Sequence, residues 1–260
     1  MPLSSEWLRY YQENAGTLLS IPWDRGAELS NEERNAIANS AREFQAGESS
    51  EGRHLLRYAQ EYAERTGDRE YVLAIRLFIA EEQRHARDLG RFLKQNDISL
   101  VRTTFTDQVF RKLRQVLHGL EISIAVLITA EIIAEVYYAV LREATRSEIL
   151  RALCDQILRD ELRHVQFQAD QLSKLRSRRS GLGIVATMAA QRFLFLGTTV
   201  VVWIGHRKAI RRGGLSPAGW WQSCWGAFDQ AFAVPAPVHI LSPARLSPAT
   251  EEPATAGTTR

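Results

Sequence analysis

The sequence predicts an all-α protein built around a bundle of four long helices. Between Ser30 and Leu172 the chain contains no proline, and residues that favour helices dominate. Within this stretch apolar residues recur at alternating spacings of three and four, the period of a helix face turned toward a shared core. Short turn signals separate the four segments that carry this pattern. Residues 30–175 are therefore expected to form the bundle.

The first pair of helices is predicted as a hairpin. Residues 30–33 have the Ser-x-x-Glu form of a capping box, which indicates a helix that begins at Ser30. This helix is expected to continue to about Thr66, where Gly67 interrupts it. A second helix is expected over about 68–94, before the turn residues Asn96 and Asp97.

A longer connection separates this hairpin from the second one. Residues 98–106 are β-branched and polar, which favours an irregular segment long enough to cross the bundle. A third helix is expected over 107–145, a short turn at 146–147, and a fourth helix that ends near 175. A long crossover between the second and third helices is the connectivity of ferritin-like bundles, so this fold is predicted.

The segments outside the bundle differ in composition. Residues 1–29 form an N-terminal helical extension without an apolar run of signal-peptide length, so a cytoplasmic protein is expected. Residues 176–233 are expected to form a basic, apolar helical extension, and residues 234–260, rich in Pro, Ala, Thr and Ser, a disordered tail. Cys154 and Cys224 form no Cys-x-x-Cys pair, which excludes a disulfide framework, a zinc knuckle and a rubredoxin-type iron site.

The C-terminal extension combines positive charge with an apolar run. Residues 171–228 contain no Asp or Glu but many Lys and Arg, which indicates either a solvated basic face or an anionic partner. Nucleic acid is not favoured as that partner, and a peripheral membrane contact stays open. Residues 181–205 are long and apolar enough for a membrane span, but Arg192 would lie near the bilayer centre. Packing on the bundle, or on a second copy in a homodimer, is expected instead, with membrane association through 181–205 as the alternative.

Acidic residues interrupt the apolar face of each predicted helix near its middle. On two of the helices a histidine follows the glutamate three residues later. Burying several carboxylates without partners is costly. Two divalent cations would nearly neutralise four glutamates, and a Glu and a His three residues apart can reach the same metal pair. The candidate metal ligands are Glu51 with Glu48, Glu82, His85, Glu131, Glu161 and His164.

The first helix offers a choice of ligand. His54 follows a glutamate at the same spacing, but the apolar face passes one position further on, so His54 is expected at the surface. Glu51 and Glu82 lie at nearly equal distances on either side of Gly67, so an antiparallel hairpin would place them at the same height. Glu51 is therefore the expected ligand, and Glu48 stays an alternative or additional one.

A doubled motif resembles that of a known superfamily. Residues 81–85 (Glu-Glu-Gln-Arg-His) and 160–164 (Asp-Glu-Leu-Arg-His) both fit (Asp/Glu)-Glu-x-Arg-His. This is similar to the motif of the ferritin-like diiron carboxylate proteins, which include rubrerythrins, ferritins and bacterial multicomponent monooxygenases. Residues 46–49 (Ala-Gly-Glu-Ser) are also rubrerythrin-like, and in that alignment Glu48 is the ligand. The resemblance covers residues 30–175 and lacks the rubredoxin module of a rubrerythrin.

The resemblance implies a role for each candidate residue. Glu82 and Glu161 would bridge two metal ions, Glu51 and Glu131 would bind one each, and His85 and His164 would each ligate one metal through a ring nitrogen. Glu81 and Asp160 would accept hydrogen bonds from the histidines of the opposite helix and so fix their orientation. The implied metals are two iron ions, with manganese or a mixed pair open.

The function expected from this resemblance is a diiron oxidoreductase that activates O2 or a peroxide and takes electrons from an external donor. Three alternatives stay open: an iron-handling ferroxidase, a membrane-associated diiron oxidase, and a non-enzymatic helical protein stabilised by metal. No residue of the sequence specifies a substrate.

Overall fold

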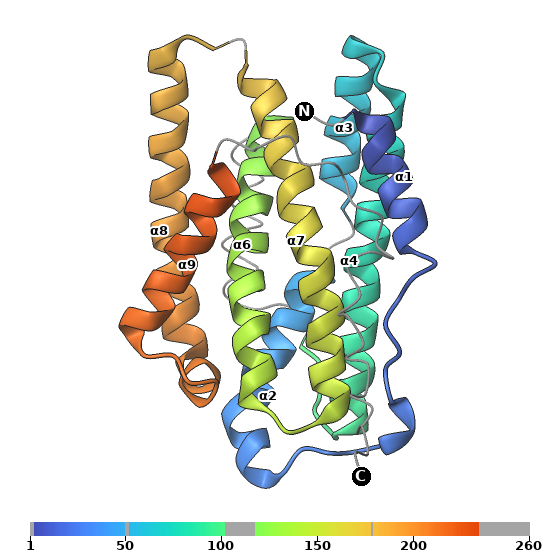
Figure 1. Cartoon of the computed structure of the whole chain (residues 1–260), viewed down its shortest axis with the longest axis vertical. Helices are drawn as coiled ribbons and strands as arrows, with labels where there is room; N and C mark the ends of the chain where they lie inside the picture. Colours follow the sequence, from blue (N-terminus) through green and yellow to red (C-terminus); the bar gives the residue numbers. More distant parts are fainter. Residues whose placement is uncertain (1–2, 50–51, 102–117, 178, 234–260) are drawn as a thin grey trace, which may run out of the picture.

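The computed structural model describes residues 3–49, 52–101, 118–177 and 179–233, and within these residues it contains helices and no strands (Figure 1). The all-helical prediction is confirmed. The elements are α1 (Ser4–Asn14), the short 3-10 helix η1 (Trp23–Arg25), α2 (Asn31–Glu48), α3 (Arg53–Thr66), α4 (Arg69–Gln95), α6 (Leu120–Ala144), α7 (Glu148–Arg176), α8 (Gly181–Arg212) and α9 (Pro217–Phe232). Most of the predicted connection over 98–106, residues 107–117 of the third predicted helix and the tail 234–260 lie outside the described residues.

The helices α4, α6 and α7 lie side by side, and α2 and α3 follow one another along their flank (Figure 1). The apolar positions predicted to face a core do so: Ile75 and Leu89 of α4, Leu141 of α6 and Ile157 of α7 are almost completely buried. The spacing of three and four therefore identified the inward faces of these helices.

Hydrogen bonds fix both the start of α2 and its contact with the α6–α7 turn. As predicted, the Ser30 hydroxyl accepts a hydrogen bond from the Glu33 backbone N–H, and the Glu33 carboxylate accepts one from the Ser30 N–H. The Glu33 carboxylate also accepts a 2.6 Å hydrogen bond from the Arg146 backbone N–H. One side chain thus caps a helix and joins two hairpins.

The first predicted helix is divided in two, because α2 ends at Glu48 and α3 begins at Arg53. Gly52 has a positive φ of 64°, which an L-residue with a side chain adopts only with strain. A Cβ at this position would lie 2.6 Å from Ile79 Cδ1 of α4. The division matters for the candidate metal ligands, because Glu51 is expected at the height of Glu82 only if the helix is continuous.

We expect Gly52→Ala to destabilise the protein by about 1–3 kcal/mol, because it combines a strained φ with displacement of Ile79. Gly47→Ala is the matched control, since Gly47 lies within α2 and has open space around it. That change should be neutral or stabilise by roughly 0.5–1 kcal/mol through helix propensity. Urea unfolding of the two variants measures the difference, and equal stabilities would contradict a special role for Gly52.

The N-terminal helix α1 packs against α4 and approaches α7. Trp7, Tyr10 and Tyr11 of α1 are buried, and the Trp7 ring lies 5.4 Å from the ring of Phe167 on α7. Aromatic side chains at this spacing give α1 an apolar face, and this face is buried only when α1 packs against the rest of the protein. Helix α1 therefore covers the side of the α4–α7 pair.

The C-terminal helices α8 and α9 lie on the other side of the molecule, next to α6 (Figure 1). Among the described residues, α6 and α8 are long and apolar enough to cross a membrane by length and composition alone. Their surroundings differ, because 72% of the most apolar stretch of α6 is buried inside the protein against 22% for α8. Helix α6 is thus a core helix, whereas most of the apolar stretch of α8 faces outward.

Candidate metal centre

Helices α4 and α7 bring the two motif segments together. On each helix the Glu and His are three residues apart and so point to the same side. His85 Nδ1 lies 3.6 Å from a Glu82 oxygen and 3.5 Å from a Glu161 oxygen. His164 Nδ1 lies 3.0 Å from Glu82 and 3.6 Å from Glu161. One ring nitrogen of each histidine therefore faces both glutamates.

Two further carboxylates complete a pair of overlapping groups. The first group consists of Glu48, Glu82, His85 and Glu161, and the second of Glu82, Glu131, Glu161 and His164. Within each group one ligand atom per residue lies within 4.8 Å of the others, a spacing at which one cation could be held. Glu82 and Glu161 belong to both groups. The arrangement is that of two adjacent cation sites sharing two carboxylates.

The centre lies inside the protein. Glu161 and His164 have no exposed surface, and Glu48 and Glu131 are also buried. Burial raises the pKa of the Glu161 carboxyl well above its usual value, and the adjacent Glu131 carboxylate raises it further. The pKa of Glu82 is raised for the same two reasons. These carboxylates hold negative charge at neutral pH only if positive charge is supplied to them.

Several polar atoms of the centre are buried without a hydrogen-bond partner. They are Glu82 Oε1, both carboxylate oxygens of Glu161, His85 Nδ1 and His164 Nδ1. Leaving such atoms unpaired in a protein interior is costly, and they converge on one space. A set of oxygen and imidazole nitrogen donors fits iron or manganese. The residues present therefore fit a pair of divalent cations.

The outer nitrogens of the two histidines are held by acids from the opposite helix. His85 Nε2 lies 3.0 Å from Asp160 Oδ2, and His164 Nε2 lies 2.9 Å from Glu81 Oε2. A carboxylate at Nε2 favours the tautomer with the proton on that nitrogen, which leaves Nδ1 free as a ligand atom. The histidine of each helix is thus held by an acid of the other helix: Asp160 of α7 holds His85 of α4, and Glu81 of α4 holds His164 of α7.

Asp160 is surrounded by donors. Besides His85, Arg84 donates to it at 2.6 Å and Gln156 at 2.8 Å. Burial alone would raise the pKa of Asp160, but the hydrogen bond and charge of His85, together with the Arg84 guanidinium, lower it far below its usual value. Asp160 is therefore a fixed negative charge behind His85.

Asn14 of α1 joins the two supporting acids. Its side-chain amide donates to Glu81 Oε1 at 2.7 Å and to Asp160 Oδ1 at 2.9 Å. Asn14 is completely buried, and its carbonyl oxygen accepts a hydrogen bond from Arg159 at 2.9 Å. One amide group from the N-terminal segment thus contacts both acids that orient the histidines.

The remaining two glutamates also have donors. The Tyr138 hydroxyl donates to Glu48 Oε1 at 2.6 Å, and Gln168 donates to Glu131 Oε1 at 3.2 Å. Burial raises the pKa of Tyr138 well above 10, and the neighbouring Glu48 carboxylate raises it further, so the phenol keeps its proton. Each of these hydrogen bonds fixes one carboxylate oxygen and leaves the other available.

Among the predicted ligands, Glu82, His85, Glu131, Glu161 and His164 lie together. Glu51 lies outside the described residues. Glu48, which was kept as the alternative or additional ligand on the first helix, lies at the end of α2 and belongs to the first of the two groups that could hold a metal ion. His54 is exposed, as its place beside the apolar face predicts.

Sequence reasoning missed the donors that surround the acids, chiefly Asn14 and Gln156. Asn14 follows Trp7, Tyr10 and Tyr11 at spacings of three and four, so it belongs to the buried face of an amphipathic helix. This pattern within residues 1–29 was a signal that could have been used. Gln156 lies one turn before Asp160 on α7, and nothing distinguished it from a surface glutamine.

We expect Asn14→Ala to weaken metal binding by about 10- to 100-fold, because it removes the donor shared by Glu81 and Asp160. The measurement is a competition titration of the metal-free protein with a chelator of known affinity. Asn39→Ala is the matched control, since Asn39 is exposed on α2 and bonds only to nearby residues of that helix. An unchanged affinity in Asn14→Ala would show that the α1 contact is only structural.

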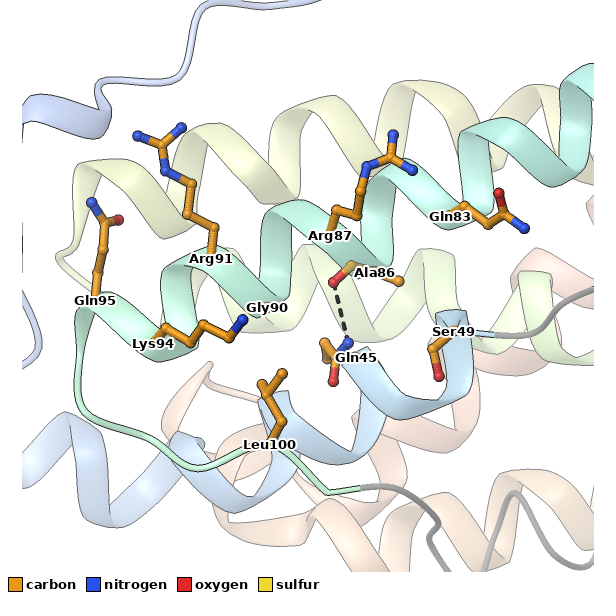
Figure 2. Close-up of a pocket in the computed structure, with 10 residues that line it drawn as sticks. All are labelled: Gln45, Ser49, Gln83, Ala86, Arg87, Gly90, Arg91, Lys94, Gln95 and Leu100. Carbon is orange, nitrogen blue, oxygen red and sulfur yellow. Dashed lines mark hydrogen bonds between the residues drawn. The ribbon is translucent and has the colours of Figure 1, made fainter.

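A surface groove of about 810 Å³ lies between α2 and α4 (Figure 2). It is lined by Gln45 and Ser49 of α2 and by Ala86 of α4, with Gln45 donating a 3.2 Å hydrogen bond to the Ala86 carbonyl. Arg87 and Arg91 extend from α4 on the side away from Gln45. Two of the lining residues are sequence neighbours of candidate ligands, because Ser49 follows Glu48 and Ala86 follows His85. The groove therefore adjoins two candidate ligands.

The chain matches no protein-family model, no curated protein and no solved structure with which it was compared.

Proposed function

We propose that the protein is a ferritin-like diiron carboxylate oxidoreductase of the rubrerythrin-like type, without a rubredoxin module. The observation that carries the proposal is the pair of overlapping cation groups that share Glu82 and Glu161. A lone cluster of acids is common on protein surfaces. A pair of clusters in which every residue but the partly buried Glu82 is buried, and each of which is completed by a histidine with an unpartnered Nδ1, is better explained by two metal ions than by chance.

In this proposal α2 with α3, α4, α6 and α7 form a ferritin-like four-helix bundle, and the chain between α4 and α6 is its crossover. One metal would be held by Glu48 and His85, the other by Glu131 and His164, with Glu82 and Glu161 shared between them. Four carboxylates and two divalent cations leave the site close to neutral, which removes the cost of burying the charges. The metals would be iron, with manganese or a mixed pair fitting the same donors.

When bound, a pair of iron ions supplies redox chemistry toward O2 or a peroxide. The protein's own residues hold and shield that chemistry. Asp160 and Glu81 fix the histidines through Nε2, and Tyr138 keeps its proton on Oη while donating it to Glu48. The ring of Phe78 lies 4.7 Å from that of His164 and helps to exclude water on that side.

Reactants and electrons need a route to this buried centre. The groove between α2 and α4 is the route we propose, because it lies beside Glu48 and His85. Its basic rim of Arg87, Arg91 and Lys94 suits a small anionic reductant or an acidic patch on an electron-donor protein. The electron donor is external, since the sequence has no Cys-x-x-Cys module.

The test of this proposal is metal analysis of the purified full chain after expression in iron-replete medium. We expect about two irons per chain and, after oxidation, the near-ultraviolet absorption and Mössbauer signature of a coupled iron pair. Consumption of O2 or peroxide on adding a reductant would then identify the oxidant. A protein purified without metal, and unable to take up Fe(II) under anaerobic conditions, would refute the proposal.

A further inference from the structure

Helix α8 buries several polar side chains and exposes large apolar ones. The residues it buries include Gln191, Thr199 and His206. The residues it exposes include large apolar side chains, with Leu182 85% exposed and Phe193 78% exposed. A helix on the surface of a soluble protein normally has the opposite arrangement. The outer face of α8 is therefore matched to an apolar environment.

The buried polar side chains hold α8 against the rest of the protein. Gln191 donates a 2.8 Å hydrogen bond to the Thr129 hydroxyl of α6. His206 Nδ1 lies 2.8 Å from the Ser40 hydroxyl of α2, and Arg212 donates to a backbone carbonyl at the end of α6. These contacts are distributed along the helix. Helix α8 is thus attached along its length and presents one fixed outer face.

The outward apolar residues form one continuous stripe, which we call the α8 stripe. Its members recur at spacings of three or four residues, with one spacing of eight, which is close to two helical turns: Leu182, Val185, Phe193, Leu196, Val200 and Ile204. At 1.5 Å per residue the stripe is roughly 33 Å long. The single charged residue in this stretch, Arg192, lies about 100° around the helix from Phe193, on the flank of the stripe.

Positive charge lies at both ends of the α8 stripe. Arg179, which is paired with Glu121, precedes it, and the exposed Arg207, Lys208 and Arg211 follow it. Residues 171–228 contain no Asp or Glu, and Arg207 and Lys208 form no ion pair within the part of the chain that the structure describes. An apolar stripe with basic ends is complementary to a bilayer with anionic headgroups. A second copy of α8 would instead bring like charges together.

We propose that the α8 stripe docks the protein on an anionic lipid bilayer, with α8 lying in the plane of the membrane. The stripe would lie at the boundary between headgroups and acyl chains, and Arg192, Arg207 and Lys208 would contact lipid phosphates. A spanning orientation is disfavoured because α8 would have to leave its contacts with α6 and α2, and Arg192 would lie near the bilayer centre. The proposal stands on α8 alone and does not depend on the metal centre.

The experiment is vesicle flotation of the full chain. Vesicles of equal parts phosphatidylglycerol and phosphatidylcholine are expected to carry the protein at low salt, whereas pure phosphatidylcholine vesicles carry much less. Phe193→Gln with Ile204→Gln should reduce binding about tenfold or more, because both side chains belong to the stripe and are exposed. Arg207→Glu with Lys208→Glu should also reduce binding, because it removes the attraction to anionic headgroups. High salt should have the same effect, because it screens that attraction.

The matched control is Leu18→Gln with Leu73→Gln, which makes an equivalent change at leucines that are 45% and 48% exposed away from α8. Its vesicle binding should equal that of the unaltered protein, and circular dichroism should show all variants folded. Three results would overturn the proposal. They are absence of flotation on anionic vesicles, retention after alkaline carbonate washing as for a spanning helix, and a lipid-free dimer in sedimentation that Phe193→Gln with Ile204→Gln dissociates.

Discussion

Replacing Glu161 by glutamine is expected to abolish binding of both metal ions while making the metal-free protein more stable. Glu161 belongs to both cation groups, so its loss removes an oxygen ligand from each site at once. Glutamine has nearly the same shape, so the helix packing around α7 should be kept. Metal content should fall from about two irons per chain to less than one.

The gain in stability follows from the surroundings of Glu161. Its carboxyl group is completely buried, and both of its oxygens lack hydrogen-bond partners. In the absence of metal this group must either take up a proton or remain charged near Glu131 and Glu82. A neutral amide avoids both costs, and we expect the metal-free variant to gain about 1–3 kcal/mol near pH 8. Loss of metal together with a gain in stability is expected if Glu161 binds metal. If Glu161 instead supported the fold, its replacement would lower the stability.

Glu135→Gln is the matched control for this variant. Glu135 lies on α6 one turn from Glu131, it is partly buried, and burial raises the pKa of its carboxyl group. It belongs to neither cation group, so its substitution should leave the metal content unchanged. Metal analysis and thermal unfolding of both variants provide the comparison. Full metal content in Glu161→Gln would contradict the assignment of Glu161 as a shared ligand.

The parts of the molecule that the sequence predicted best are those where one periodic pattern decides the outcome. Glu82 and His85 interrupt an apolar face of period three and four, and a polar pair at such positions must be buried with a compensating partner. The same reasoning placed Glu161, His164 and Glu131 at the centre. These inferences needed only the register within each helix, which the sequence contains.

The ligand on the first helix could not be placed in this way, because its position depends on backbone conformation between helices. A positive φ at Gly52 ends the helical register, so counting residues from Gly67 no longer gives the height of Glu51 or Glu48. The rubrerythrin-like stretch around Glu48 does not assume a continuous helix, and Glu48 belongs to one of the two groups that could hold a metal ion. Glu51 lies outside the described residues, so the choice between the two stays a prediction.

Asn14 shows a second limit of sequence reasoning. Its contacts with Glu81 and Asp160 join residues far apart in the chain, and the docking of α1 on α4 is a tertiary event that no single helix specifies. The buried polar face of α8 has the same origin, because Gln191 becomes an inner residue only when its partner Thr129 on α6 is in place. Composition showed that α8 is apolar but not which of its faces is outward.

A second large effect is expected in the pH dependence of the metal-free protein, whose free energy of unfolding should fall as the pH rises from 6.5 to 8.5. Burial and the neighbouring Glu131 carboxylate raise the pKa values of Glu82 and Glu161 far above those of the unfolded chain. The pKa of His164 is also raised: burial alone would lower it, but the adjacent carboxylates of Glu161, Glu81 and Glu82 favour the protonated ring and outweigh the burial. The folded state therefore holds more protons than the unfolded state in this range.

The sign follows from proton linkage. A group whose pKa is raised on folding stabilises the protein below its unfolded pKa, and this stabilisation is lost as the pH rises through the folded pKa. Each extra proton held by the folded state corresponds to a loss of about 1.4 kcal/mol per pH unit. His206, whose pKa burial lowers to about 4, has the opposite dependence, but it adds only about 0.4 kcal/mol across this window, because half of the unfolded chains have already lost this proton at pH 6.5.

Metal should remove this pH dependence, because bound cations replace the protons on Glu82, Glu161 and His164. Denaturant unfolding at pH 6.5, 7.5 and 8.5, with and without metal, measures the two slopes. In Glu161→Gln the slope of the metal-free protein should become shallower, since one of the proton-holding groups is gone. A metal-free protein whose stability is constant or rises over this range would mean that protons do not neutralise the buried carboxylates, and the charge argument for two cations would lose its basis.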